Sequence, residues 1–116
     1  MATKTAVELA TAALRQYNKL AAEETISAAD SDLIIGVYQA KLEDWSEEGL
    51  VYWTYDATPQ VVFQTLVELV WNEVSPAFGV PNPVEQKYQR ETLLLKRLRR
   101  HVGRRTSGFQ TKAVYY

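Results

Sequence analysis

Apolar side chains recur at helical spacing in four stretches of the chain, and each stretch is bordered by residues that commonly begin or end a helix. Thr5 and Glu8 have the spacing of a capping box, which predicts a first helix near residues 6–20. Ser27, with an acidic residue three positions on, repeats that signal before a second amphipathic stretch. Gly49 is placed to cap the C-terminal end of this second helix.

The second half of the chain predicts two further helices. The third begins at Thr58-Pro59, with proline at the first helical position where no N–H is required, and stops at Pro76. Its interior carries only two charged side chains, so we expect it to be the most buried helix. The fourth opens at Asn82-Pro83, runs to about Val102 and is broken by Gly103. One face of this helix collects the side chains expected to contact the core, namely Val84, Tyr88, Leu95, Leu98 and Val102.

Two segments lie outside this pattern. Residues 50–55, Leu-Val-Tyr-Trp-Thr-Tyr, are aromatic and β-prone, and predict a short strand or a loop packed on the bundle. Residues 103–116 contain two glycines and little periodicity. The expected fold is therefore all-α: a four-helix bundle-like domain over residues 1–102, an aromatic loop between the second and third helices, and an extended C-terminal arm over residues 103–116. The 116 residues suffice for one domain with its own core.

Charge is distributed unevenly along the chain. Residues 84–116 carry nine Lys or Arg against two Glu, a formal charge of +7, whereas residues 1–83 carry four basic and twelve acidic side chains, a charge of −8. The total of −1 therefore hides a strongly polarised molecule. Such a chain can attract a polyanion at one end and a basic surface at the other, and it is suited to head-to-tail association of copies.

Basic residues of the fourth helix and the arm are the candidates for contact with DNA or with a neighbouring subunit. Arg90, Arg97 and Arg104 recur every seven residues. Two interpretations stay open: a solvated helix face whose cations favour the helix C-terminus, or a basic stripe that faces phosphate or an acidic subunit. No helix presents residues suited to contact base edges, so sequence-specific DNA binding is less favoured than nonspecific phosphate contact. The full set of candidates is Arg90, Lys96, Arg97, Arg100, Arg104 and Arg105.

The arm ends in large apolar side chains, although its composition alone would leave it disordered. A terminus of this kind is commonly frayed or folded back on its own domain. An exposed aromatic end, however, is prone to unwanted association unless it docks, and tyrosine and phenylalanine are favoured interface anchors. We therefore favour docking to a partner chain. The expected anchors are Phe109, Val114, Tyr115 and Tyr116.

The sequence lacks groups of residues that would predict catalysis or metal binding. There is no cysteine, which excludes disulfides, thiolate metal sites and cysteine nucleophiles, and His101 is the single histidine. The carboxylate pairs at 23–24 and 47–48 are adjacent in sequence, so on a helix they point in different directions. We expect no enzymatic activity, no metal and no cofactor. The absence of an apolar leader or an 18-residue apolar run predicts no membrane partner and no export by a recognisable signal.

Several ordered features resemble a known family. Residues 8–15 read Glu-Leu-Ala-Thr-Ala-Ala-Leu-Arg, residues 42–45 read Leu-Glu-Asp-Trp ahead of Gly49-Leu50, and residues 75–80 read Ser-Pro-Ala-Phe-Gly-Val between an apolar helix and a long one. In this order and spacing they resemble the tail accessory factors of short-tailed phages, also called packaged-DNA stabilization or head-completion proteins. The resemblance covers roughly residues 7–102. Residues 17–20 depart from the Leu-Gly turn common in relatives, and the arm is shorter than in some of them.

The resemblance implies a structural virion protein, a head-to-tail adaptor that forms a ring, usually a dodecamer, under the portal after DNA packaging. The implied partners are the portal protein, a downstream tail (nozzle or hub) protein, neighbouring copies of the chain and, nonspecifically, the packaged DNA. The implied place is the head–tail interface of the virion, after synthesis in the host cytoplasm. It further implies that residues 103–116 reach the portal and that part of the fourth helix faces the DNA channel. The alternative is a small helical DNA-binding packaging or regulatory protein that uses Arg97, Arg100, Arg104 and Arg105.

Overall fold

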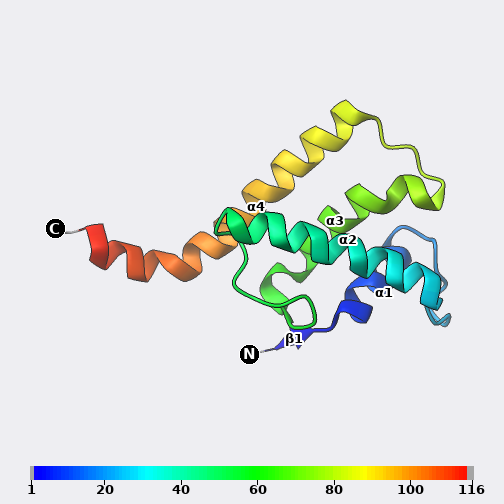
Figure 1. Cartoon of the computed structure of the whole chain (residues 1–116), viewed down its shortest axis with the longest axis horizontal. Helices are drawn as coiled ribbons and strands as arrows, with labels where there is room; N and C mark the ends of the chain where they lie inside the picture. The colour runs from blue at the N-terminus through cyan, green and yellow to red at the C-terminus, as the bar shows by residue number, and fades with distance from the viewer. Residues whose placement is uncertain (1, 115–116) are drawn as a thin grey trace.

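Four helices form a bundle-like domain with α3 at its centre, which confirms the expected all-α class (Figure 1). The computed structural model describes the backbone of residues 2–114 and the side chains of residues 2–102. The helix α3 contacts each of α1, α2 and α4. In chain order the elements are β1 (Thr3–Lys4), α1 (Ala6–Gln16), α2 (Ala28–Glu47), β2 (Thr58–Pro59), α3 (Gln60–Val74), the 3-10 helix η1 (Ser75–Phe78) and α4 (Val84–Val114).

Side-chain caps fix the beginnings of α1 and α2 where the sequence predicted them. The Thr5 hydroxyl accepts a hydrogen bond from the Glu8 backbone N–H at 3.2 Å, and the Glu8 carboxylate accepts one from the Thr5 N–H at 3.0 Å. At the start of α2, the Ser27 hydroxyl accepts from the Asp30 N–H at 3.2 Å. Each cap satisfies backbone donors that have no partner inside the helix and contributes about 1 kcal/mol.

The ends of the same two helices are set by residues in the left-handed conformation. Gly49 (φ 77°) follows α2 as expected, and the Leu50 N–H bonds back to the Trp45 carbonyl at 2.9 Å. Asn18 (φ 61°) follows α1 in the same left-handed conformation, and the Lys19 N–H bonds back to the Leu14 carbonyl at 2.8 Å. Because asparagine tolerates this conformation, α1 ends at Gln16 rather than near residue 20.

The helix α3 is the most buried helix, as predicted, but both of its ends differ from the expectation. Pro59 lies before the helix with an extended backbone (ψ 139°) because it belongs to β2, so the first helical residue is Gln60. The α-helix ends at Val74, and the chain continues through Pro76 as η1. Proline is accepted there because the first turn needs no N–H from it. Gly79 (φ 81°) then ends η1 in a conformation that glycine adopts at little cost.

The core lies between α3 and the three helices around it. Trp45 and Trp71 are buried in it, whereas Trp53 is half-buried. Burial of one large apolar side chain contributes about 1.5–3 kcal/mol. The apolar side chains that are fully enclosed are Leu9, Ala10, Ala13, Ile34, Tyr38, Leu66, Val67, Val70 and Leu98.

Residues 50–55 form a loop that packs on the bundle, and the strand lies elsewhere. The Trp53 indole N–H donates to the Tyr38 hydroxyl at 3.1 Å, and that hydroxyl is 2.6 Å from the Thr58 hydroxyl in a buried hydrogen bond. The paired strands are β1 and β2, antiparallel with Lys4 opposite Thr58. This short ladder attaches the N-terminus to the start of α3.

The helix α4 continues through Gly103 to Val114, so the prediction that Gly103 ends it is wrong. A glycine inside a helix costs about 1 kcal/mol, which neighbouring strong helix formers such as arginine can offset. The 31 residues of α4 give a length of about 46 Å. Figure 1 shows its second half leaving the bundle, so the C-terminal arm exists but is helical as far as Val114. No helix in residues 2–114 is both long and apolar enough to cross a membrane.

Candidate assembly surfaces

Polar contacts from α3 hold the first half of α4 against the bundle. The buried Asn72 side chain donates to the Lys87 carbonyl at 2.9 Å. Asn82, in the linker before α4, donates to the backbone and side-chain oxygens of Asn72 at 2.7 and 3.0 Å. Asparagine side chains therefore satisfy the buried polar groups at the place where the chain turns into α4.

Glu73 forms a second polar connection, which joins α2, α3 and α4. Its carboxylate lies 3.1 Å from both the Lys41 and the Lys87 ammonium groups, and Lys41 is also 3.5 Å from Glu91. Burial alone would raise the pKa of Glu73, but the two lysines outweigh it and the pKa is lowered. Burial would likewise lower the pKa of Lys41, but Glu73 and Glu91 raise it.

Replacing Glu73 with glutamine is expected to lower the free energy of unfolding at pH 7 by about 1–2 kcal/mol, because two lysines lose their shared counter-charge. A carboxyl whose pKa is lowered in the folded state stabilises the protein above its unfolded pKa of about 4.3, and that contribution disappears as the pH falls through the folded pKa. The difference between wild type and Glu73→Gln should therefore shrink from pH 7 to pH 3. Urea titrations at both pH values measure it, with the exposed Glu85→Gln as the control variant. A difference that is the same at both pH values would contradict this account.

These polar contacts turn α4 away from the orientation that its apolar pattern predicted. Leu98 and Val102 are buried and Leu95 is half-buried, as expected. Val84 and Tyr88, however, are 81% and 71% exposed, so their assignment to the core was wrong. The positions that face the bundle in this half of α4 carry Lys87 and Glu91, whose charges are met by Glu73 and Lys41.

The basic residues of α4 whose side chains are described do not form one free surface. The Arg97 guanidinium pairs with the Glu68 carboxylate and donates to the Thr65 hydroxyl at 3.0 Å. Arg90 donates to the Asn82 side-chain oxygen at 3.3 Å. Among the described side chains, Lys96 and Arg100 are exposed and lack an ion-pair partner. The side chains of Arg104, Arg105, Phe109, Val114, Tyr115 and Tyr116 lie outside the described residues.

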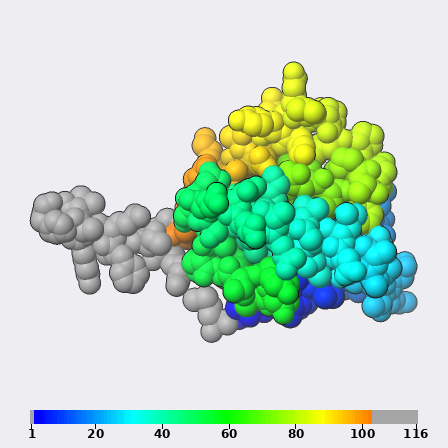
Figure 2. All heavy atoms as spheres, viewed as in Figure 1, coloured from blue at the N-terminus to red at the C-terminus, as the bar shows by residue number. Residues whose placement is uncertain are grey.

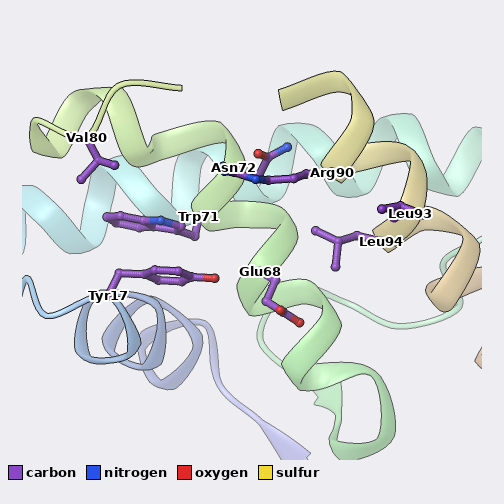
Figure 3. Close-up of a pocket in the computed structure, with 8 residues that line it drawn as sticks. All are labelled: Tyr17, Glu68, Trp71, Asn72, Val80, Arg90, Leu93 and Leu94. Carbon is purple, nitrogen blue, oxygen red and sulfur yellow. The ribbon is translucent and has the colours of Figure 1, made fainter. Parts of the chain in front are cut away.

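A groove with an aromatic floor lies between the end of α1, α3 and the first half of α4 (Figure 3). The rings of Tyr17 and Trp71 stack at 4.6 Å with their planes 6° apart, and Phe78 of η1 lies 6.0 Å from Trp71. On the opposite side, Leu93 and Leu94 of α4 border the groove. The groove has a volume of about 460 Å³.

The polar groups of this groove are mostly engaged with one another. Glu68 is held by Arg97, and Asn72 by Asn82 and α4. Burial raises the pKa of Tyr17, and the nearby Glu68 carboxylate adds to this effect. Arg90 is the exposed cation at the edge. An apolar or aromatic group with a carboxylate beside it would fit these surroundings better than a charged small molecule.

Sequence reasoning missed this groove. Tyr17 and Trp71 were recognisable as apolar positions of their helices, but stacking between helices depends on the tertiary arrangement. Among the described residues, no group of three or more His, Asp or Glu is placed to hold a metal ion. Comparison of the chain with protein-family models, with curated proteins and with solved structures found no match.

Proposed function

We propose that this chain is a structural virion protein, a phage head-to-tail adaptor that binds the portal ring and extends and helps close the DNA channel. In this role it helps retain the packaged genome and gives a platform for the next tail protein. The observation that carries the proposal is the shape of the subunit, a small helical domain from which one long helix projects (Figure 1). In an assembly, the helical domain of such a subunit can lie in one ring while its projecting helix contacts a neighbouring component.

The projecting part of α4 supports a contact with a separate component. The 12 residues 103–114 add about 18 Å beyond the part of α4 that packs in the bundle. The proposed anchors, Phe109, Val114, Tyr115 and Tyr116, belong to this last part of the chain. We assign the portal contact to these residues because aromatic side chains bury large areas at small entropic cost.

Polarised charge supports a ring of copies around DNA. The region from residue 84 onward has a charge of +7 and the preceding region −8, so a basic side can face the acidic side of the next copy. Lys96 and Arg100, both exposed, are the described candidates for nonspecific phosphate contacts. Arg97 instead serves the bundle through Glu68, so we assign it a structural role.

We propose no catalytic role, cofactor or membrane partner for the chain, and we place it at the head–tail interface of the virion. The DNA-binding alternative is less well supported. Lys87, Arg97 and Arg99 of α4 are in intramolecular ion pairs, which leaves Arg90, Lys96 and Arg100 as the described α4 cations available to phosphate. A duplex-binding surface normally presents many unpaired Lys and Arg side chains.

Affinity capture tests the proposal. Tagged full-length chain is incubated with nuclease-treated lysate of cells in which the encoding phage is propagating, and captured proteins are identified by mass spectrometry. We expect the portal protein, retained when the wash is raised from about 50 to about 200 mM salt, a change that strongly weakens phosphate-based binding. Recovery of no virion protein, with DNA recovered when nuclease is omitted, would overturn the proposal in favour of the DNA-binding alternative.

A further inference from the structure

Two apolar surfaces lie on opposite sides of the first half of α4. The first, here called the ridge, consists of Val84 and Tyr88 and is 81% and 71% exposed. The second is the lip of the aromatic groove, where Leu93 is 66% exposed. At 100° per residue, Val84 and Leu93 project about 180° apart on the helix. Figure 2 shows the start of α4 protruding at the edge of the molecule, open to a partner.

We propose that the ridge of one copy packs into the aromatic groove of the next copy, and that this contact joins neighbouring subunits. The proposal rests on the ring assembly proposed above and names the surfaces that make it. Because ridge and groove are different surfaces on opposite sides of one helix, the contact repeats in one direction from copy to copy. A contact of this kind builds a closed ring when the rotation between copies allows it.

The groove and the ridge are chemically complementary. The groove offers the edges of the stacked Tyr17 and Trp71 rings with Leu93 and Leu94 opposite, which suits an aromatic side chain such as Tyr88 in an edge-to-face contact. Its volume of about 460 Å³ lies in the range of pockets that enclose a bound group. The Tyr88 hydroxyl would donate to the Glu68 carboxylate, which lines the groove and pairs with Arg97 through its Oε2 oxygen.

The charges beside the two surfaces also match. Glu85 lies beside the ridge, about 60° from Tyr88 around the helix. It is exposed and has no ion-pair partner among the described residues. Arg90 stands at the groove, and within the described part of the chain its hydrogen-bond partner is the neutral Asn82. A Glu85 carboxylate from the next copy therefore meets an available guanidinium. A charge pair at this edge would fix the direction of the contact.

The chain's own arm is a poor occupant for its groove. Residues 93 and 114 belong to the same helix and lie about 32 Å apart along it, so the arm could reach back only by breaking α4. The ridge cannot fill the groove of its own chain either, since both surfaces belong to one helix. A second copy is the occupant that satisfies both surfaces together.

Cysteine cross-linking tests the contact, and the chain is suited to it because it has no cysteine of its own. Two full-length single variants, Val84→Cys and Leu93→Cys, carry tags of different mass and are mixed at high concentration with a short bis-maleimide cross-linker. We expect the mixed dimer to exceed either homodimer several-fold. The matched control replaces Leu93→Cys with Val61→Cys, a site that is also exposed and does not line the groove. The same experiment is repeated on material captured with the portal.

Reversing the two proposed partner charges adds specificity to the test. Glu85→Arg on the first variant, or Arg90→Glu on the second, should reduce the mixed dimer several-fold, and the two changes together should restore it. A mixed dimer no more abundant than with Val61→Cys, or homodimers in equal amounts, would overturn this contact. If portal capture still succeeds in that case, the adaptor function stands and only the contact is wrong. If cross-linking succeeds while capture fails, copies associate as proposed and the adaptor function is wrong.

Discussion

Replacing Trp71 with alanine is expected to lower the free energy of unfolding by about 3–5 kcal/mol, the usual cost of removing a buried large aromatic side chain. Trp71 is 6% exposed and stacks with Tyr17, which follows α1, and with Phe78 of η1. Its loss would open a cavity where α1, α3 and η1 meet. Small domains have a total stability of about 5–15 kcal/mol, so the variant should lose much of it.

Urea denaturation followed by circular dichroism measures this effect. Trp71→Phe keeps an aromatic ring in the stack and should cost less than half as much as the alanine variant. The control variant is Leu33→Ala on α2, because Leu33 is 42% exposed and its truncation should change the free energy of unfolding by well under 1 kcal/mol. A Trp71→Ala variant as stable as this control would show that the stack does not hold α1 to α3.

Deleting residues 107–116 is expected to abolish capture of the portal protein while the helical domain keeps its unfolding midpoint. The truncated chain retains every core side chain that the structure describes, from Leu9 to Val102. The mean-residue helical signal should change little, although the deletion removes residues 107–114 of α4. Capture from nuclease-treated lysate, with quantification of the portal protein, compares truncated and full-length chains directly.

A full-length variant separates the proposed anchors from the length of the arm. Alanine at Phe109, Tyr115 and Tyr116 keeps residues 107–116 present but removes the aromatic groups. We expect capture to fall at least tenfold, because a few aromatic anchors commonly supply most of the binding energy at an interface. Portal capture that is undiminished in the truncated chain would contradict the assignment of the arm.

Much of the fold could be predicted from the sequence because its signals are local. The caps at Thr5, Ser27 and Gly49 act within a few residues of themselves, and the apolar spacing of α3 reports its burial directly. What depends on distant residues was not predictable. The pairing of Thr3–Lys4 with Thr58–Pro59 joins segments far apart in sequence, and neither segment reads as a strand alone.

The errors in α4 have a common physical origin. Its apolar pattern placed Val84 and Tyr88 in the core, but charged positions face the bundle because Glu73 and Lys41 compensate Lys87 and Glu91. A half-buried ion network of this kind leaves no signature in hydrophobic periodicity. Gly103 by itself predicts the end of a helix. The free-energy cost of a glycine inside a helix is only about 1 kcal/mol, however, which the flanking residues can offset.

The candidate surfaces were predictable only in part. Charge polarity and the aromatic end of the chain are properties of sequence, and they led to the basic residues and the arm. The internal partner of Arg97 and the stacking of Tyr17 on Trp71 are tertiary properties. The groove and the exposed ridge, which together suggest how copies meet, were therefore visible only once the helices were in place.

Electron microscopy of the captured complex shows whether the chain forms a ring on the portal. Full-length chain bound to the purified portal ring is imaged, and the portal alone serves as the reference. We expect added density of helical subunits in a closed ring, coaxial with the portal channel and continuing it. Isolated copies bound elsewhere on the portal, or no added density at saturating concentrations of the chain, would contradict the adaptor function.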